Sequence, residues 1–482
     1  MSSGMIILFV AAVTIYFYCR RRSRLPLPPG PPSKFFTGNA HQLPKKEPWR
    51  MYATWAESYG PIFSFRVPNR QFIVLNSLKS ATELLDSRAT TYSDRPKIWM
   101  FTELAKRSLP PFNISFNHPY FKMYRTIFKS SLSPRTIQSY QSLQTEQSRV
   151  LLDDLHKNPE QFADHIRRSA GAVVLHLAYG WKSIESNDYF LGVLREWEEM
   201  SNILLQPGRW LVEVMPSLRF IPSWFPGAGF KRVAFDLGKK LSRLDAIPIN
   251  WTKQQIKSGS YMHSFVSEQL LPEDGSTVSA QHEEIVKWCS HGIYRGGVDT
   301  QTAFSITSFI LAMMLYPEVQ KHAQAEIDAV VGQDQFPTFK DRGKLPYIGA
   351  LILELLRWAP VAPQGLSHHA MKEDVYEGYH IPKGATVIPN IYSMSRDKEM
   401  YPDPLEFRPE RFLGPSPQLD PHKFVFGFGR RSCPGLHFAE ASLGEEITLP
   451  AEFEGVGLLW RPKPFKCRFI PRNKDLLATL SQ

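Results

Sequence analysis

The residues best suited to chemistry lie between positions 424 and 435, around a single cysteine, Cys433. The stretch reads Phe-Val-Phe-Gly-Phe-Gly-Arg-Arg-Ser-Cys-Pro-Gly, with glycines at Gly427 and Gly429. Glycine lets a backbone turn sharply and pass close to a flat ligand, which a Cβ would obstruct. The spacing therefore predicts a tight loop that presents one sulfur atom to a bound group.

The neighbours of Cys433 favour its thiolate form. Arg430 and Arg431 place two positive charges beside the thiol, and we expect them to lower its pKa. A helix-forming run begins at Leu436, so the sulfur lies near a helix N-terminus, where the dipole also favours negative charge. One cysteine cannot hold zinc or an iron–sulfur cluster, whereas a haem iron needs a single axial ligand from the protein.

The same stretch contains the pattern Phe426-x-x-Gly429-x-Arg431-x-Cys433-x-Gly435. This pattern resembles the haem-ligand loop of the cytochrome P450 superfamily, and the resemblance extends over residues 26–482 to the microsomal fungal type. It implies a mainly α fold with small β-sheets, the cytochrome P450 fold. Cys433 would ligate the iron of haem b, and the other four residues would bind the cofactor. The alternative is a glycine-rich turn around a buried structural cysteine.

The resemblance also implies an activity and its partners. The protein would be a monooxygenase that inserts one atom of O2 into an apolar small molecule, in secondary metabolism or xenobiotic oxidation. The chain has no Gly-rich nucleotide loop or flavin motif, so electrons would come from NADPH through a cytochrome P450 reductase, with cytochrome b5 as a further donor. We expect an acidic reductase to dock near Lys122, Lys129 and Arg430.

A second chemical pattern lies inside a long helical stretch, residues 283–316, which contains Gly296-Gly297-Val-Asp299-Thr300. Adjacent glycines in a helix interior are unfavourable by roughly 1 kcal/mol each relative to alanine, so a compensating function is expected. The pattern is similar to the Ala/Gly-Gly-x-Asp-Thr element of the family. This likeness implies that the missing side chains leave room for dioxygen, and that Thr300 and Asp299 are catalytic residues that deliver protons. The alternative is a kinked core helix.

Two further residues are expected to bind the carboxylates of the haem. The family carries a Trp-x-x-x-Arg pattern whose arginine pairs with a propionate, and this chain offers Phe121-x-x-x-Arg125. Arg125 keeps the charge, whereas Phe121 lacks the indole N–H donor. His368, with His369 as the alternative, occupies a place from which such proteins often reach a propionate. A solvated helix face for Arg125 and a surface position for His368 are the competing interpretations.

Glu354, Arg357 and Arg411 are predicted to form a structural triad. Glu354 and Arg357 are three residues apart on a predicted helix, and Arg411 follows in the segment Pro-Glu-Arg-Phe. The family joins the corresponding residues in a buried ion-pair cluster beneath the haem. We expect the triad to fix that region of the fold and to take no part in the chemistry.

Composition narrows the class of protein and its compartment. The net charge of +11 suits an anionic membrane surface or an acidic protein partner, and nucleic acid is discounted because no nucleic-acid motif accompanies it. The cysteines are few and scattered, at Cys19, Cys289, Cys433 and Cys467. This spacing suggests neither a disulfide framework nor a zinc site, so a reducing compartment is expected.

The N-terminal region is predicted to anchor the protein in a membrane. Residues 4–19 are uncharged and mostly apolar, and a cluster of arginines follows within residues 20–24. We expect residues 1–24 to form a single-pass transmembrane helix with a basic stop, 25–33 a proline-rich hinge and 34–482 the haem-thiolate catalytic domain. The positive-inside rule places that domain in the cytosol, at the endoplasmic reticulum membrane. The alternative is a cleaved signal peptide.

Periodicity and turn residues predict the elements that position these groups. Residues 139–257 have helical period, with breaks at 206–208 and 221–227. The second break is either a turn that dips into the membrane or a buried loop. The remaining elements expected are helices at 48–59, 77–85 and 120–131 and strands at 62–67, 71–75 and 375–381.

The helix after Cys433 is expected to be short, since the run from Leu436 to Leu443 is followed by Gly444 and Pro450. The family normally has a long helix here that packs under the haem. The shortening raises the alternative of a haem-binding protein that is inactive or is not a monooxygenase. A third possibility is a membrane-tethered binding protein without haem.

Overall fold

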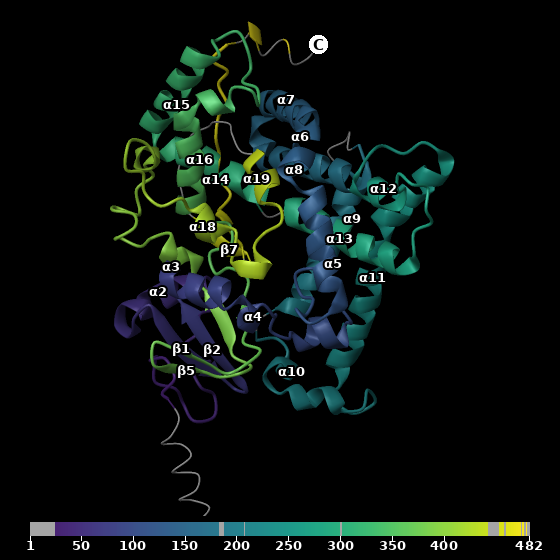
Figure 1. The fold of residues 1–482 in the computed structure, drawn as a ribbon, viewed down its shortest axis with the longest axis vertical. Helices are drawn as coiled ribbons and strands as arrows, with labels where there is room; N and C mark the ends of the chain where they lie inside the picture. The colour runs from purple at the N-terminus through teal and green to yellow at the C-terminus, as the bar shows by residue number, and fades with distance from the viewer. Residues whose placement is uncertain are drawn as a thin grey trace, which may run out of the picture.

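The computed structural model describes residues 25–441 except 183–187, 207 and 299–300, together with residues 453–456, 459–473, 475–476 and 479. Within these residues the protein is mainly helical with three small β-sheets, which confirms the expected fold class (Figure 1). The predicted transmembrane segment, residues 1–24, lies outside the described residues.

A four-stranded mixed sheet forms the N-terminal part of the fold. Its order is β1 (Ile62–Val67), β2 (Arg70–Leu75), β6 (Thr386–Pro389) and β3 (His368–His369). The pairs β1–β2 and β3–β6 are antiparallel, and β2–β6 is parallel. The alternating apolar residues of 62–67 and 71–75 explain the two long strands, which confirms that prediction. Strand β3 brings His368 to the edge of this sheet.

Helix α2 (Pro48–Tyr59) has the predicted bounds and covers the sheet. Proline at its first position is compatible with a helix start, because the missing N–H would have no partner there. Its buried Tyr52 packs with Phe63, Phe65 and Val74 of the first two strands. The predicted helix over 77–85 is only partly α-helical, since α3 (Leu78–Ala81) continues as the π-helix η1 (Thr82–Ser87).

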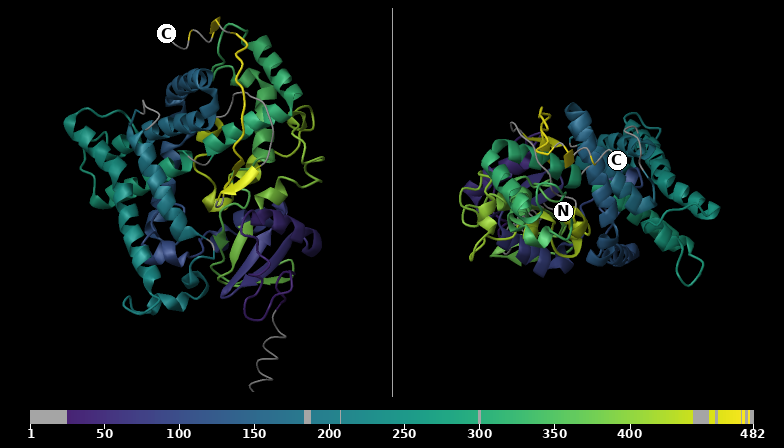
Figure 2. Two further views of the ribbon diagram at one scale, coloured as in Figure 1. Left: turned by 180° about the vertical axis from the view of Figure 1, so that it is seen from behind. Right: turned by 90° about the horizontal axis from the view of Figure 1, so that it is seen from above.

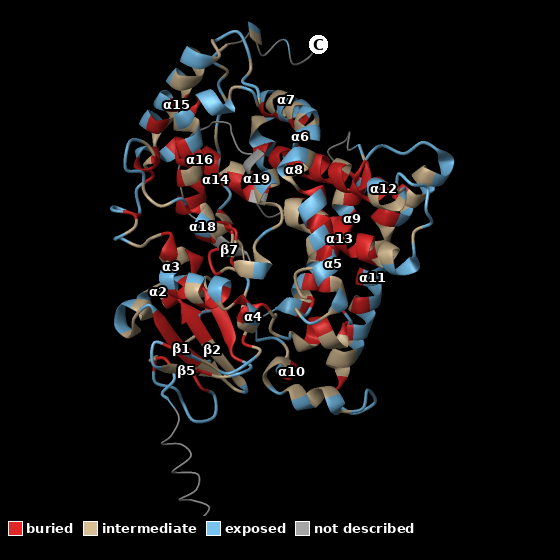
Figure 3. Ribbon diagram, viewed as in Figure 1, coloured by how far each residue is buried: buried red, intermediate tan, exposed pale blue. Residues whose placement is uncertain are grey.

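The largest helical group packs around one core. Its members are α5 (Pro119–Ser131), α6 (Pro134–Ser139), α7 (Gln141–Lys157), α8 (Phe162–Tyr179), α9 (Tyr189–Leu205), α11 (Gly229–Ser258), α12 (Phe265–Leu270) and α13 (Ala280–Val298). Buried side chains from α5, α8, α9, α11 and α13 form a single hydrophobic cluster. Figure 3 shows these buried residues along the facing sides of α8, α9 and α13. The helical prediction for 139–257 missed the breaks after Lys157 and Tyr179.

A second group of helices packs between the sheet and the C-terminal segments. It consists of α14 (Gln301–Leu315), α15 (Pro317–Val330), α16 (Pro346–Trp358), α18 (His422–Val425) and α19 (Leu436–Ala441). Figures 1 and 2 show this group (green to yellow) on the sheet side, with the blue and teal helices forming the other half. Helix α19 contacts α6 and packs on α16, so it lies where the two halves meet.

The stretch 283–316 was expected to be one helix. The structure gives α13 and α14 on either side of residues 299–300, which lie outside the described residues. The span Ala280–Leu315 is long and apolar enough to cross a membrane, but 80% of its apolar window is buried inside the protein. This span is therefore a core element of the fold.

The predicted strand over 375–381 is wrong, because two short strands form a hairpin there. Strand β4 (Asp374–Tyr376) pairs with β5 (Tyr379–Ile381) in antiparallel register. Glu377 and Gly378 between them have positive φ values of 47° and 81°. Positive φ at both central positions is typical of a type I′ turn, which matches the twist of a two-residue hairpin.

The remaining elements are short. They are α4 (Ala89–Tyr92), η2 (Trp99–Leu104), η3 (Pro159–Gln161), α10 (Leu211–Val214), η4 (Pro216–Phe220), η5 (Arg342–Lys344), α17 (Ile391–Met394), η6 (Pro409–Phe412), η7 (Gly429–Arg431), β7 (Phe453–Val456) and β8 (Leu459–Pro462). The predicted helix end at Leu443, and with it the expected shortening after that residue, lies outside the described residues.

Candidate active site

The loop that carries Cys433 connects α18 to α19 and is held in place at Phe426. The Cys433 amide donates to the carbonyl oxygen of Phe426 at 2.7 Å, which closes the loop on itself. The Phe426 ring is buried, packs with Ile352 and Leu356 of α16, and stacks on His422 with ring centroids 5.4 Å apart. The phenylalanine of the motif therefore fixes the loop to a long core helix.

The glycine of the motif at position 429 is required by its surroundings. Gly429 has a φ of 55°, and a Cβ on it would overlap the carbonyl oxygen of Leu85. Its amide donates to the Asp86 carboxylate, also in η1. Burial raises the pKa of Asp86, and the hydrogen bond from Gly429 partly offsets that rise. The absence of a side chain here brings the loop into backbone contact with the sheet side of the fold.

The environment of the Cys433 thiol differs from the one predicted. Desolvation raises the pKa of the thiol, and this rise is partly offset by the Gly435 amide and by the charge of Arg125. Arg431 points away toward backbone carbonyls, and the Arg430 guanidinium lies over the Phe116 ring at 5.2 Å. The prediction that these two arginines lower the pKa of the thiol is wrong. A bound cation at the sulfur would favour the thiolate instead.

Arg125 and Arg431 approach the loop from two sides. Arg125 on α5 donates to the Ser432 carbonyl at 2.8 Å. Arg431 donates to the carbonyls of Ser93 at 2.7 Å and Ile114 at 2.6 Å, and its guanidinium lies 4.4 Å from the centroid of the Phe121 ring. Desolvation lowers the pKa of both arginines, that of Arg431 to about 10. Phe121 thus serves as a platform for an arginine of the loop.

Arg95 was missed by the sequence analysis. Its Nη1 donates to the carbonyls of Leu366 and Ser367 at 2.8 Å each, while its buried Nε has no hydrogen-bond partner among the residues that the structure describes. Desolvation, followed by the nearby charge of Arg431, lowers its pKa to about 9. The available signal was the Asp-Arg-Pro sequence at residues 94–96, where a charged residue precedes a rigid turn.

His368 is buried, which excludes the surface interpretation. Its Nδ1 lies 2.7 Å from the Tyr92 carbonyl oxygen. Desolvation, followed by the charge of Arg95, lowers the pKa of the imidazole to about 3. The side chain is therefore neutral at physiological pH, and its single N–H, on Nδ1, donates to the Tyr92 carbonyl. His369 instead forms an isolated bridge with Asp94.

These residues fit the carboxylates of a haem. Arg95, Arg125 and Arg431 are partly or fully desolvated cations around one loop, and Asp94 is the carboxylate whose charge acts on Arg95 and Arg431. Desolvated cations are unfavourable unless they are paired, so the cluster has the donor chemistry to hold further anionic oxygens. The partnerless Nε of Arg95 is one such donor.

Glu354, Arg357 and Arg411 come together in the buried interior. Arg357 donates to both oxygens of Glu354 at 2.7 Å, and Arg411 lies 3.1 Å from the same carboxylate. All three side chains are fully buried. The two arginines also donate to backbone carbonyls at positions 395, 402, 404 and 406, which ties the irregular segment before the loop to α16. The triad contacts no residue of the cysteine loop in these hydrogen bonds.

Asp299 and Thr300, the predicted catalytic residues, lie outside the described residues. The glycines before them have packing reasons of their own. A Cβ on Gly297 would press into Val174 of α8, and one on Gly296 would contact Phe112 at 3.6 Å. Close approach of α8 to α13 therefore accounts for Gly297, independently of any role in making room for oxygen.

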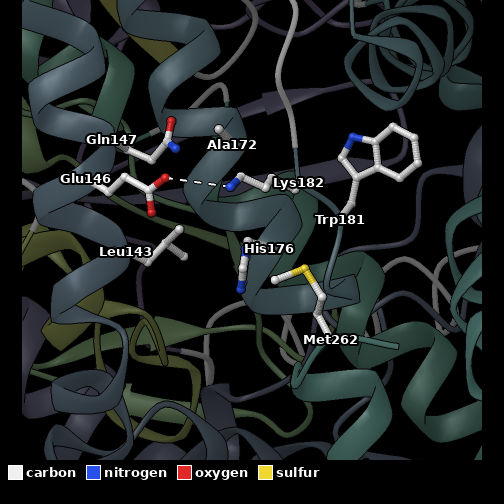
Figure 4. A pocket seen from close by; sticks show the side chains of 8 residues that line it. All are labelled: Leu143, Glu146, Gln147, Ala172, His176, Trp181, Lys182 and Met262. Atoms are coloured by element: carbon white, nitrogen blue, oxygen red, sulfur yellow. Dashed lines mark ion pairs between the residues drawn. The ribbon is translucent and has the colours of Figure 1, made fainter. Parts of the chain in front are cut away.

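A separate cavity of about 80 Å³ lies between α7 and α8 (Figure 4). Glu146 and Lys182 form an ion pair of 3.9 Å across it, and His176 lines it. Burial lowers the pKa of His176. This cavity holds a few water molecules at most and is far smaller than a typical ligand pocket of about 300–1,000 Å³. It belongs to the packing of the helices and not to the site around Cys433.

Comparisons with known proteins agree with this site. A model of the family "Cytochrome P450" matches residues 28–445. The chain is 36% identical to cytochrome P450 monooxygenase claR of Ampulloclitocybe clavipes, over 96% of this chain and 89% of that protein. It is 35% identical to cytochrome P450 monooxygenase 208 of Postia placenta, over 99% of this chain and 97% of that protein. It is 34% identical to cytochrome P450 monooxygenase ppsD of Aspergillus oryzae, over 93% of this chain and 89% of that protein.

The family match spans most of the chain, and the relatives align with nearly its whole length. Family membership implies a haem cofactor, an electron-donating reductase and a small-molecule substrate. The chain therefore belongs to the cytochrome P450 family, in its fungal type, and its activity is that of a monooxygenase oxidoreductase.

Proposed function

We propose that the protein is a microsomal monooxygenase in which Cys433 is the axial ligand of haem b. One observation carries this proposal: a single cysteine stands on a loop fixed to the core, beside the desolvated arginines Arg95, Arg125 and Arg431. One thiolate and a group of carboxylate-binding cations are together the donor set that haem b needs. When bound, the haem supplies the reductive activation of O2, so that one oxygen atom enters the substrate and the other leaves as water.

The cofactor-binding roles are divided among the residues of the site. Arg125, Arg431 and Arg95 donate hydrogen bonds to the propionates, because they surround the loop and are already desolvated. Neutral His368 spends its one N–H on the Tyr92 carbonyl and lies beside Arg95, so it supports the cofactor site without donating to a propionate. Phe426, Gly429 and Gly435 shape the loop. Phe426 anchors it to α16, and Gly429 allows its contact with η1. Glu354, Arg357 and Arg411 hold the supporting segment and take no part in chemistry.

Asp299 and Thr300 would deliver the protons that the reaction consumes. Support comes from the family motif and from the position of the two residues directly after α13, whose Gly292 and Gly296 face residues 111 and 112. The carboxylate of Asp299 exchanges protons with solvent, and the hydroxyl of Thr300 donates a hydrogen bond. The reaction consumes two protons and two electrons for each O2.

The electrons come from NADPH through cytochrome P450 reductase, with cytochrome b5 as a second donor. Lys122 and Lys129 are exposed on α5, the helix whose Arg125 contacts the cysteine loop, so an acidic partner docked there lies close to the cofactor. Arg430 adds a third charge, since it is also exposed, with its guanidinium 5.2 Å from the centroid of the Phe116 ring. Substitution of Lys122 and Lys129 by glutamate is expected to slow reduction by the reductase about tenfold and to weaken its salt dependence.

The matched control for this docking face is Lys340→Glu, because Lys340 is exposed and follows α15, a helix that Figure 1 shows well apart from α5. Its reduction rate should equal that of the wild type. An unchanged rate and salt dependence in the Lys122 and Lys129 double variant would remove this docking face from the proposal.

Residues 1–24 anchor the protein in the endoplasmic reticulum membrane, residues 25–33 form the hinge, and residues 34–482 form a cytosolic catalytic domain. An exposed apolar surface lies at the sheet end of the fold, made of Phe35, Phe36, Leu211, Phe220 and Trp224, whose exposed fractions range from 70% to 82%. Arg70 pairs with Glu213 at 2.8 Å and joins the α10 side of this surface to the sheet. The 221–227 turn is exposed, since Trp224 lies within it. This exposure excludes the buried-loop alternative and supports contact of the turn with lipid.

Alkaline carbonate extraction of cell membranes tests the anchor. We expect the full chain to stay in the membrane pellet, because a spanning helix resists extraction while a peripheral protein does not. Release into the supernatant would contradict the anchor and leave the haem assignment intact.

The substrate is an apolar small molecule of secondary metabolism or a xenobiotic. Aromatic side chains at Phe112 and Phe116 on the segment between α13 and the cysteine loop support an apolar preference. The decisive test of the whole proposal is the difference spectrum of the reduced protein with carbon monoxide. We expect the red-shifted Soret band of thiolate ligation. Haem with another axial ligand, or no haem at all, would overturn the assignment of Cys433.

A further inference from the structure

A buried ion pair ties to the helical core one segment, called the wall below, that contacts both α13 and the loop of Cys433. The wall is the segment 105–116, and the pair joins its Arg107 to Asp245 of α11, with Nη2 and Oδ2 2.6 Å apart. Both side chains are almost fully buried, with exposed fractions of 1% and 2%. Each buried charge is stabilised by its partner, because a single unpaired charge in this interior would be strongly unfavourable.

The backbone conformation before Arg107 directs its side chain into the core. Lys106 is exposed and adopts a left-handed conformation with φ of 58°, which turns the backbone so that the next side chain points inward. Just before it, the carbonyl of Ala105 lies against Gly238 of α11, where a Cβ would approach it to 2.6 Å. The segment therefore packs directly on α11, and the Arg107 side chain reaches Asp245 of the same helix.

Several groups surround the ion pair. The Trp197 indole donates to Asp245 at 2.9 Å, and Arg107 donates weakly to the Ser242 hydroxyl at 3.4 Å. The Arg107 guanidinium also lies 5.1 Å from the centroid of the Trp288 ring. The further titratable groups whose charges reach this cluster are His291, Arg295 and Lys287 of α13. Burial lowers the pKa of His291 to about 3, so it is neutral and Asp245 is left to balance Arg107.

The other end of the segment contacts the cysteine loop. Arg431 donates to the carbonyls of Pro111 and Ile114. Between the two ends, Pro111 and Phe112 face Gly292 and Gly296 of α13. The segment thus contacts both α13 and the loop of Cys433. We expect a molecule held between these two elements to pack against it.

We propose that the Arg107–Asp245 pair is a latch that holds this wall closed and sets the size of the molecule that reaches the haem. Arg107 and Asp245 are positioning residues for substrate access, since neither contacts the cysteine loop in the hydrogen bonds and ion pairs of the described residues. Opening the wall separates the two charges, which opposes large ligands more than small ones. The inference rests on the proposed haem site for its ligand test but not for its test of mobility.

The variant that tests the latch is Arg107→Met combined with Asp245→Asn. It removes both charges together, so no unpaired charge is left in the core, and asparagine still accepts from Trp197. The matched control is Asp188→Asn. Asp188 is also buried and accepts from a tryptophan, Trp181 at 2.7 Å, but it has no tie to the 105–116 segment. The single variant Asp245→Asn provides a second test of the same tie.

Two probes of different size, imidazole and 4-phenylimidazole, are added to the ferric protein, and their association rates are followed at the Soret band. We expect the double variant to bind 4-phenylimidazole at least about tenfold faster than the wild type and imidazole within about twofold. Asp188→Asn should keep the wild-type ratio. An unchanged ratio, or an equal acceleration for both probes, would overturn the latch.

Hydrogen–deuterium exchange of the full chain gives a second measurement that does not need the cofactor. The amides of residues 105–116 should exchange at least about tenfold faster in the double variant and in Asp245→Asn than in Asp188→Asn. Equal exchange in all of them would overturn the latch even in protein without haem. The two failures can be told apart. If the variants differ in exchange as expected but the wild type lacks the thiolate spectrum, the latch stands and the haem site is contradicted.

Discussion

The Nη1 atom of Arg125 lies 2.8 Å from the carbonyl oxygen of Ser432, the residue immediately before Cys433. Desolvation lowers the pKa of Arg125, and the proximity of the Cys433 thiol partly offsets that effect. One guanidinium therefore stands beside the backbone of the ligand loop and within electrostatic range of its sulfur. A residue expected to bind a propionate also orients the loop that carries the proposed axial ligand.

Removing this guanidinium should weaken haem binding. In Arg125→Leu the loop loses a charge-assisted hydrogen bond and the cofactor loses a partner, so we expect haem affinity to fall at least about tenfold in titrations of the purified protein. Arg125→Lys should recover part of this loss. The control is Lys129→Leu, an exposed position on the same helix, which should bind haem as the wild type does. Equal affinities in all variants would contradict the role of Arg125.

Replacing Cys433 should change the spectrum without unfolding the protein. In Cys433→Ser one sulfur is replaced by an oxygen of similar size at a position outside the hydrophobic clusters of the described core, and little core packing changes. The reduced carbon-monoxide complex should therefore lack the band of thiolate ligation, while circular dichroism stays that of the wild type. Cys467→Ser, at a half-buried cysteine of the C-terminal segment, should keep the band. A band retained in Cys433→Ser would place the ligand elsewhere.

Gly429→Ala should displace the ligand loop. The added Cβ overlaps the Leu85 carbonyl and occupies a left-handed backbone position, a strain of roughly 1–3 kcal/mol before the overlap is counted. We expect a lower haem content per chain and a lower thermal midpoint. Gly343→Ala is the control, since its Cβ meets open space at an ordinary φ. Full haem content in Gly429→Ala would show that the loop tolerates the shift.

Local patterns predicted the elements with strong periodicity and clear turns. The alternation in 62–67 and the proline at position 48 gave bounds that the structure reproduces. The 375–381 hairpin was missed because its turn carries glutamate at the first positive-φ position, where asparagine or aspartate is the usual signal. The change from α to π geometry after Ala81 has no sequence signal of this kind.

The candidate site was predictable where one segment supplies the chemistry and less so where several segments meet. The spacing around Cys433 identified the loop, and the order of Glu354, Arg357 and Arg411 identified three side chains that meet in space. The direction of Arg431 was not predictable, because its partners are backbone carbonyls more than 300 positions away. The position of Arg95 was not predictable for a similar reason, because its partners are the distant backbone carbonyls of Leu366 and Ser367.

The carboxylate of the buried triad should be essential to stability. Glu354→Gln leaves two buried arginines without their anion, and we expect the free energy of unfolding to fall by about 3–5 kcal/mol in urea titrations. The control is Glu318→Gln, which removes an exposed i, i+3 pair with Lys321 and should leave the urea midpoint unchanged. A wild-type midpoint in Glu354→Gln would mean that the arginines are held by their backbone contacts alone.

Acidification should destabilise the protein through His368. Burial lowers the folded-state pKa of this imidazole to about 3, whereas an unfolded histidine has a pKa near 6.5. Between those values the unfolded chain binds the extra proton, so the free energy of unfolding falls as the pH drops through that window. For this one group, the loss between pH 7 and pH 5 is about 2 kcal/mol.

The variant His368→Gln isolates this contribution. Glutamine stays neutral and can still donate to the Tyr92 carbonyl, while the neighbouring Arg95 and Arg431 keep their charge over the same range. Urea titrations at pH 7 and pH 5 should therefore show a loss smaller by about 2 kcal/mol in the variant than in the wild type. His41→Gln, at an exposed histidine, should lose as much as the wild type. If His368→Gln also loses as much as the wild type, the acid sensitivity comes from other groups, and His368 is not held neutral by its burial.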